Sequence, residues 1–88
     1  MAAYWVYILY SPSYQKTYVG QTVNVVQRLE RHNKGSVPST RRYKPWLVVD
    51  IRECATRAEA MKLEKYFKSG KGREEVKKFI AEFLRQDG

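Results

Sequence analysis

Two short apolar runs separated by a turn-forming cluster constrain the fold of this chain more than any other feature. Residues 4 to 10 read Tyr-Trp-Val-Tyr-Ile-Leu-Tyr, residues 11 to 14 read Ser-Pro-Ser-Tyr, and residues 15 to 21 are again rich in strand-forming types. Such runs on either side of a short turn predict an antiparallel β-hairpin. The first run is apolar or aromatic on both faces, which is typical of a central strand covered on both sides.

Each predicted strand carries a tyrosine, Tyr7 or Tyr18, and their relative position depends on the pairing register. If Tyr10 pairs with Gln15 across a four-residue loop, Tyr7 lies directly opposite Tyr18 on one face, with Cβ atoms roughly 4.5–5.5 Å apart. A slip of one residue would place them on opposite faces, so this register is a hypothesis. Most strand tyrosines only pack in a core, and a chemical role for Tyr7 therefore depends on its neighbours.

Gly20 lies inside the second predicted strand. A glycine there loses side-chain packing and often marks a bulge or a close approach to the backbone. Two explanations stay open at this point. Either a phosphate backbone approaches Gly20, or the chain bends there into the following helix.

A helix is predicted after the hairpin, with Thr22 or Asn24 as its N-cap and Gly35 as its stop. Arg28 and His32 are four residues apart and share one flank of this helix. A guanidinium beside an imidazole makes a reasonable phosphate site, because the first donates planar hydrogen bonds and the second transfers a proton near neutral pH. The same pair on its own is more commonly part of a solvated face.

Residues 35 to 45 form a loop by composition, with hydroxyl groups and cations interleaved. This loop is the best candidate for phosphate contacts that do not depend on base sequence, with Tyr43 stacking on a base. The alternative is an ordinary solvated basic loop. The predicted nucleic-acid-binding residues are Gly20, Lys34, Ser39, Thr40, Arg41, Arg42 and Lys44.

The rest of the chain predicts one strand and two helices. The strand covers residues 46 to 53, a capping box at residues 56 to 59 opens a helix that runs to about residue 70, and a third helix covers residues 73 to 86. The order ββαβαα gives an α+β fold, in which helices flank a three-stranded, mainly antiparallel sheet. At 88 residues, we expect one domain over residues 1 to 88.

Glu64 falls within the apolar stripe of the second predicted helix, between Ala60 and Phe67. A carboxylate there is costly unless it is paired with a cation. A structural ion pair with an arginine is the more common arrangement. Beside the two tyrosines and Arg28 we favour metal ligation, because hard cations such as Mg²⁺ prefer carboxylate and water ligands.

The charge of the chain favours a polyanionic partner. Seventeen Lys and Arg against nine Asp and Glu give a formal net charge of +8, which favours nucleic acid or, as the weaker alternative, an anionic membrane surface. The single cysteine, Cys54, excludes an intramolecular disulfide and a Cys-rich zinc site. No signal peptide or membrane-spanning run is visible, so we expect a cytoplasmic location with no membrane partner.

The motifs taken together resemble those of the GIY-YIG nuclease superfamily, and in particular its small stand-alone members. The likeness rests on Val6-Tyr7, Tyr18-Val19-Gly20, Arg28, His32 and Glu64, and it covers nearly the whole chain. It implies the same fold and a metal-dependent endonuclease that hydrolyses phosphodiester bonds in DNA, structure-selective or weakly specific, of the repair or recombination type.

The resemblance also implies a role for each of these residues. Tyr7 takes the proton from the attacking water, Tyr18 helps to place water or phosphate, Arg28 clamps the scissile phosphate, and Glu64 holds a single Mg²⁺ or Mn²⁺. A free phenol has a pKa of about 10, so Tyr7 needs help at neutral pH. Either Arg28 and the metal lower its pKa, or His32 accepts the proton through Tyr7 as a relay, and the sequence leaves both routes open.

Two other interpretations compete with the endonuclease. Many family members carry an asparagine beyond the metal-binding glutamate, and residues 72 to 78 contain none. We interpret this as a subgroup difference, but weak or lost catalysis would make the chain a nucleic-acid-binding module of the same fold. A packing or partner-binding domain is the third interpretation, based on the apolar final helix. We expect no small-molecule cofactor, and a protein partner could supply specificity.

Overall fold

The computed structural model describes residues 3–86. Its elements are β1 (Tyr4–Ser11), β2 (Lys16–Thr22), α1 (Val25–Lys34), a short 3₁₀ turn η1 (Arg41–Tyr43), β3 (Leu47–Cys54), α2 (Arg57–Phe67) and α3 (Gly70–Gln86). The predicted α+β fold class and the order ββαβαα are confirmed.

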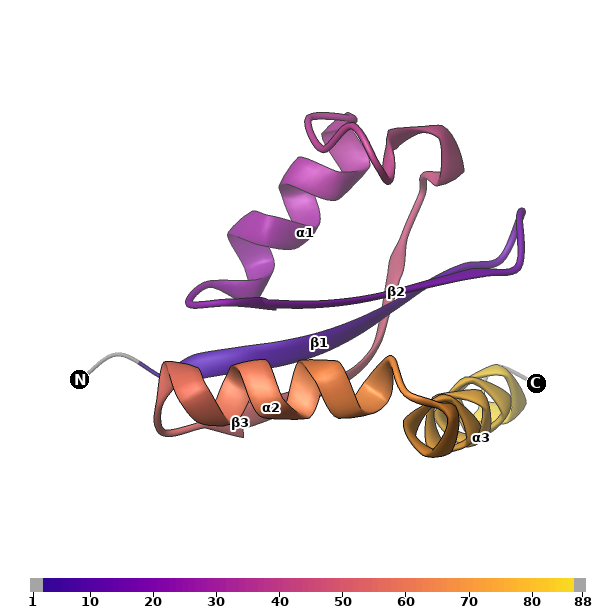
Figure 1. Cartoon of the computed structure of the whole chain (residues 1–88). Coiled ribbons are helices and arrows are strands. Elements are labelled where there is room, and N and C mark those ends of the chain that lie inside the picture. Colours follow the sequence, from indigo (N-terminus) through magenta and orange to yellow (C-terminus); the bar gives the residue numbers. More distant parts are fainter. Residues whose placement is uncertain (1–2, 87–88) are drawn as a thin grey trace.

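A three-stranded antiparallel sheet in the order β2-β1-β3 forms the middle layer. Figure 1 shows α1 on one side of the sheet and α2 with α3 on the other. Val6 and Ile8 of β1 pack into a core beneath α2 and α3, whereas Tyr7 and Leu9 pack into a second cluster on the α1 side. The central strand is therefore apolar on both faces because it is buried from both sides.

The predicted hairpin register is wrong by two residues. Tyr10 pairs with Thr17, and Tyr7 pairs with Gly20 rather than with Tyr18. The reason is that Gln15 adopts a positive φ of 53° and belongs to the turn instead of the strand. A shift of two residues preserves the alternation of a strand, so Tyr7 and Tyr18 still share one face, with ring centroids 6.1 Å apart.

Asn24 caps α1, and its side chain accepts a hydrogen bond from the Gln27 backbone N–H at 3.0 Å. Gly35 ends the helix with a φ of 82°, in the left-handed region that glycine adopts without strain. The capping box of α2 is also present, because the Thr56 hydroxyl accepts from the Glu59 N–H at 3.1 Å. These helix ends were predicted, since capping depends on nearest neighbours in the chain.

The predicted break between the second and third helices is present, but it lies at Lys68 and Ser69 instead of at the glycines. Helix α3 begins at Gly70, three residues before the predicted start at Arg73. Gly72 lies so close to the end of α2 that a Cβ there would be 1.9 Å from the Tyr66 carbonyl oxygen. Its function is thus to let two helices approach closely.

Strand β3 departs from the regular alternation of a strand, in which Leu47, Val49 and Ile51 would face the same way. A bulge lies opposite Ile8 and Leu9, so that Val49 packs against the α2 and α3 core while Ile51 pairs with Tyr7 on the other face and is 43% exposed. Asp50 forms a 2.8 Å ion pair with Arg52 on this edge strand, as expected of a surface carboxylate.

Cys54 is a buried free thiol that packs in the core on the α2 and α3 side. Across residues 3–86, no helix has the length and apolar character needed to cross a membrane.

Candidate active site

The hydroxyl of Tyr7 lies at the centre of a cluster on the α1 side of the sheet. Tyr7 is only 2% exposed, and its oxygen lies 3.1 Å from Nε2 of His32. Arg28 donates a hydrogen bond from Nε to the same oxygen at 3.4 Å. The strand thus supplies the phenol, and one flank of α1 supplies both of its polar neighbours.

His32 is completely buried, and both of its ring nitrogens face hydroxyl groups. Nδ1 lies 2.7 Å from Oγ1 of Thr40, whose hydroxyl donates to the Val37 carbonyl at 3.4 Å. A Thr40 hydroxyl that donates to a carbonyl can only accept from the imidazole, which places the proton on Nδ1. Nε2 is then free to accept the proton of Tyr7.

Burial and two cations keep His32 neutral. Desolvation, followed by the charges of Arg28 and Arg31, lowers the pKa of His32 from 6.5 to about 4. At neutral pH the ring therefore acts as a hydrogen-bond acceptor toward Tyr7 and not as a cation.

The pKa of Tyr7 is raised above 10 by the burial of its phenol. Its hydrogen bond with Arg28 acts in the opposite direction but is outweighed, and nearby Tyr18 raises the pKa further. The expectation that Arg28 would make the phenol more acidic thus holds for the direction of its effect but not for the net result.

Gly20 provides the space that the Tyr7 hydroxyl occupies. A Cβ at position 20 would lie 2.6 Å from the Tyr7 oxygen and 2.9 Å from a ring carbon of Tyr18. Gly20 itself is buried, and the group that approaches its backbone closely is the phenol of Tyr7. A phosphate contact at Gly20 stays a prediction.

Tyr18 completes the cluster from the edge strand β2. Its half-buried ring lies beside the imidazole of His32, with centroids 4.9 Å apart, and beside the Tyr7 ring. Since β2 has no neighbour on its outer side among the strands of residues 3–86, Tyr18 stands where solvent or a substrate can reach it.

A second layer of contacts that the sequence did not reveal fixes the position of Thr40 and thereby of His32. The Trp46 indole N–H donates to the Thr40 carbonyl at 3.0 Å. Asn33, the next residue after His32, accepts from the Trp46 backbone N–H at 2.6 Å and donates to its carbonyl at 3.1 Å. An asparagine beside the histidine was the only local signal, and it does not identify a partner 13 residues away.

Glu64 lies on α2, on the opposite side of the sheet from the tyrosine cluster. Its carboxylate accepts from Gln21 of β2 at 3.1 Å and forms a 2.7 Å ion pair with Lys68 one turn further along α2. Gln21 also lines, together with Arg28, a hollow of about 160 Å³ at the edge of the sheet. Within residues 3–86 no hydrogen bond or ion pair joins Glu64 directly to the cluster, and Gln21 is the residue between them.

Comparison with protein families identifies this arrangement. Residues 3–78 match the family model described as the GIY-YIG catalytic domain, which is most of the chain. The chain belongs to the GIY-YIG family. This confirms the resemblance expected from the motifs, and it places the protein in a nuclease superfamily whose substrate is nucleic acid.

A solved structure agrees with this GIY-YIG assignment. The solution NMR structure of a UPF0213 protein from Bacillus halodurans aligns with a TM-score of 0.51 and 28% sequence identity, over 84% of this chain and 81% of that one. A comparison with curated protein sequences gives no significant match.

GIY-YIG nucleases typically use a divalent metal ion, and Glu64 has the chemistry to hold one. No group of three His, Cys, Asp or Glu side chains that could bind a metal occurs in residues 3–86. Mg²⁺ often needs only one or two carboxylates, with waters and substrate phosphates as its other ligands. The donors at the two Glu64 oxygens, Lys68 and Gln21, occupy positions that a cation and its water could take.

The loop after α1 is exposed at most of the residues predicted to bind nucleic acid. The exposed members are Lys34, Ser39, Arg41, Arg42 and Lys44. Thr40 is the exception: it is only 2% exposed, and its hydroxyl lies 2.7 Å from Nδ1 of His32, so its contact with phosphate stays a prediction. The Tyr43 ring, expected to stack on a base, is already approached by Lys16 and Arg42, each 5.5 Å from its centroid.

Proposed function

We propose that this GIY-YIG protein is a metal-dependent endonuclease that hydrolyses phosphodiester bonds in DNA. We infer a structure-selective or weakly specific enzyme of the repair or recombination type, with RNA as an alternative substrate. The observation that carries the proposal is the buried Tyr7 hydroxyl between a guanidinium donor, Arg28, and an unprotonated imidazole nitrogen of His32.

This arrangement supports a proton relay. An attacking water gives its proton to the Tyr7 oxygen, and the phenol proton moves to Nε2 of His32, its hydrogen-bond partner at 3.1 Å. The relay is unfavourable in the free protein, because the pKa of Tyr7 is raised while that of His32 is lowered to about 4. A phosphate bound beside Arg28 and Arg31 would offset the two charges that lower the pKa of His32, so substrate itself would make the imidazole more basic.

Arg28 is suited to hold the scissile phosphate. It lines the hollow at the sheet edge with Arg31 while its Nε stays on the Tyr7 oxygen. A planar guanidinium donates two parallel hydrogen bonds to phosphate, which positions it and offsets the charge that develops in the transition state. Glu64 would hold the divalent cation, whose contribution when bound is to stabilise the charge on the phosphate and on the leaving oxygen.

The orientation of α1 favours weak sequence specificity. Reading a long sequence requires an element that fills the major groove or an added module with base-edge contacts. The helix that carries the candidate site, α1, has its functional flank turned toward the sheet. Specificity would then come from the shape of the substrate or from a protein partner.

The first test is cleavage of supercoiled plasmid and of a branched oligonucleotide with Mg²⁺, Mn²⁺ or EDTA. Tyr7→Phe and Glu64→Ala should each lower the metal-dependent rate by about 10²-fold or more, because each removes a group that acts in the transition state. Tyr10→Phe, on the opposite face of β1, and Glu82→Ala on α3 are the matched controls and should cleave like the wild type.

A second candidate function is a nucleic-acid-binding module without useful activity. It is favoured by the raised pKa of Tyr7 and by the ion pair that occupies Glu64 in the free protein. If the wild type and Glu64→Ala show the same background cleavage while the oligonucleotide still binds, the binding module would be the correct function and the endonuclease proposal would be wrong.

A further inference from the structure

A groove lies on the far side of β2 from the His32 cluster. It has a volume of about 500 Å³ and runs between β2 and the junction of α2 with α3. Val19, Phe67 and Val76 form an apolar floor, and each of them is at most 7% exposed. A volume of this size is typical of sites for small organic groups.

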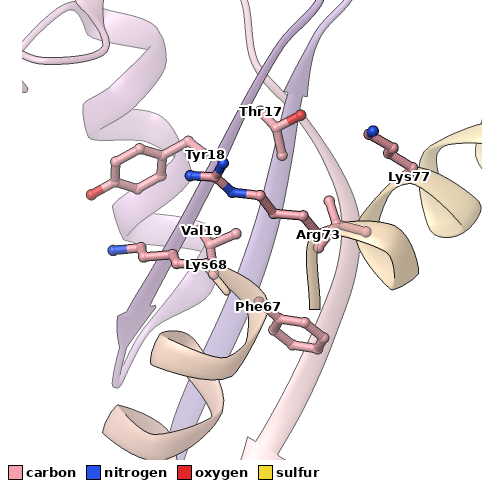
Figure 2. Close-up of a pocket in the computed structure, with 8 residues that line it drawn as sticks. Thr17, Tyr18, Val19, Phe67, Lys68, Arg73 and Lys77 are labelled. Carbon is pink, nitrogen blue, oxygen red and sulfur yellow. The ribbon is translucent and has the colours of Figure 1, made fainter. Parts of the chain in front are cut away.

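The rim of the groove is basic. Lys68, Arg73 and Lys77 line it, and Figure 2 shows the Arg73 side chain extending across the groove toward Tyr18, with Lys77 at the other end. Within residues 3–86 Arg73 has no carboxylate within 4.0 Å, and Lys77 has only a loose 3.8 Å contact with Glu74. Two of the three cations are therefore available to an anion from outside.

An apolar floor under a cationic rim is complementary to a nucleotide, which presents an aromatic base and a phosphate. Exposed cations on any surface are enough to attract a phosphate, so the apolar floor is the feature that favours a base. A base can reach the floor only if it is not paired and stacked within a duplex, as single-strand-binding grooves require.

The position of this groove relates it to the candidate active site. Tyr18 lines the groove and also contacts His32 and Tyr7. The hollow that contains Arg28 meets β2 at Gln21, four residues from Thr17 at the groove, which is about 13 Å of strand at about 3.3 Å per residue. A single strand crossing the open edge of β2 would pass from one to the other.

We propose that this groove, formed by β2, α2 and α3, binds an unpaired nucleotide next to the scissile phosphate, and that the substrate is therefore DNA with a single-stranded segment. This inference gives the proposed endonuclease a substrate class and depends on the proposed function. Binding in the groove can nevertheless be measured without cleavage.

The test measures binding of a fluorescein-labelled thymidine octamer in EDTA, where no metal-dependent cleavage occurs. The double variant Arg73→Gln/Lys77→Gln should weaken binding roughly tenfold and make the salt slope shallower by about 1.4, because each single-strand phosphate contact contributes about 0.7. Lys71→Gln/Lys78→Gln removes the same charge from exposed positions of α3 outside the groove and should change both values little.

The apolar floor is tested by removing the bases. An abasic octamer with the same phosphates should bind the wild type several-fold more weakly than the thymidine octamer, and this preference should disappear in Arg73→Gln/Lys77→Gln. A 5-iodouracil octamer should cross-link to the peptide that contains Tyr18 or Phe67.

Three results would overturn the groove assignment: equal losses in the two double variants, no preference for bases over abasic sites, or cross-links confined to Tyr14 and Tyr43. Failure of the endonuclease proposal looks different, since cleavage would be absent while the octamer still binds and cross-links in the groove.

Discussion

The imidazole of His32 is fully buried between two hydroxyl groups, those of Tyr7 and Thr40. Its pKa is lowered from 6.5 to about 4, so the unfolded chain takes up a proton near pH 6.5 that the folded protein does not take up until about pH 4. The contribution of His32 to the free energy of unfolding should therefore be fully present above pH 6.5. It should decrease by about 3 kcal/mol as the pH falls from 6.5 to 4.

Urea denaturation at pH 7.5 and at pH 4.5 measures this dependence. The carboxylates contribute to acid denaturation as well, so the decisive quantity is the difference between the wild type and His32→Gln. The variant should lose much less stability on acidification. Parallel curves for the two proteins would mean that His32 is protonated in the folded state.

Thr40 is buried and positions His32 through the contact of its hydroxyl with Nδ1. Thr40→Val should cost about 1–3 kcal/mol, because it leaves Nδ1–H of the buried imidazole without an acceptor. It should also change the ¹⁵N chemical shifts of the ring toward a mixture of tautomers, a change that loss of packing alone does not cause. Thr40→Ser keeps the hydroxyl and should restore the shifts, and a serine variant that behaves like valine would exclude the hydroxyl as the cause.

At the residue scale, the sequence predicted the polar members of the site but not their supports. Tyr7, Arg28 and His32 could be found because their order and spacing match a motif. Thr40 was expected on the surface because it stands in a basic loop, and only the tertiary contacts of Trp46 and His32 bury it.

At the scale of elements, the junction between α2 and α3 depends on one glycine. Gly72→Ala would place a Cβ 1.9 Å from the Tyr66 carbonyl oxygen and 2.6 Å from Phe67 Cα, both of them backbone atoms that cannot move alone. We expect the free energy of unfolding to fall by more than about 2 kcal/mol, because the added methyl group overpacks a close contact between the helices. Thermal denaturation followed by circular dichroism would measure it.

Gly70→Ala is the matched control, because a Cβ at that position meets no atom within 4 Å outside its chain neighbours and the adjoining backbone of its own helix. Alanine is the better helix former by up to about 1 kcal/mol, so Gly70→Ala should leave the melting temperature unchanged or raise it. If both variants melt like the wild type, the two helices do not approach as closely as described.

The elements themselves were largely predictable, and their relative placement was less so. Capping by Asn24 and Thr56 depends on residues three positions away, so local sequence contains it. The hairpin register depends on the positive φ of Gln15, and the bulge in β3 turns Val49 toward the core on the α2 and α3 side. Neither leaves a local signal, because turn geometry and bulges are selected by contacts made across the sheet.

For the whole molecule, the formal charge of +8 implies salt-sensitive binding to nucleic acid. If single-stranded DNA engages Arg28, Arg41, Arg42 and Lys44 together with Arg73 and Lys77 of the groove, six contacts give a slope of about −4 in log K against log salt. Affinity for an oligonucleotide should then fall about 300-fold between about 50 and 200 mM salt. Fluorescence anisotropy at four salt concentrations measures the slope.

Replacing Arg41 and Arg42 by glutamine should make that slope shallower by about 1.4. A slope near zero in the wild type would contradict an electrostatic nucleic-acid surface on this protein. The sign of the charge was evident from composition, but its distribution over the loop after α1 and the groove beside β2 follows from the tertiary fold.

Gly20 has an evolutionary consequence beyond its place in the site. A methyl group there would collide with the phenols of both Tyr7 and Tyr18, so the position admits glycine alone for as long as both tyrosines stay where they are. A descendant whose function no longer needs the Tyr7 and Tyr18 rings in these positions could carry another small side chain at position 20. The identity of that one residue would then distinguish, among related chains, lineages that keep the chemistry from those that have drifted to another use.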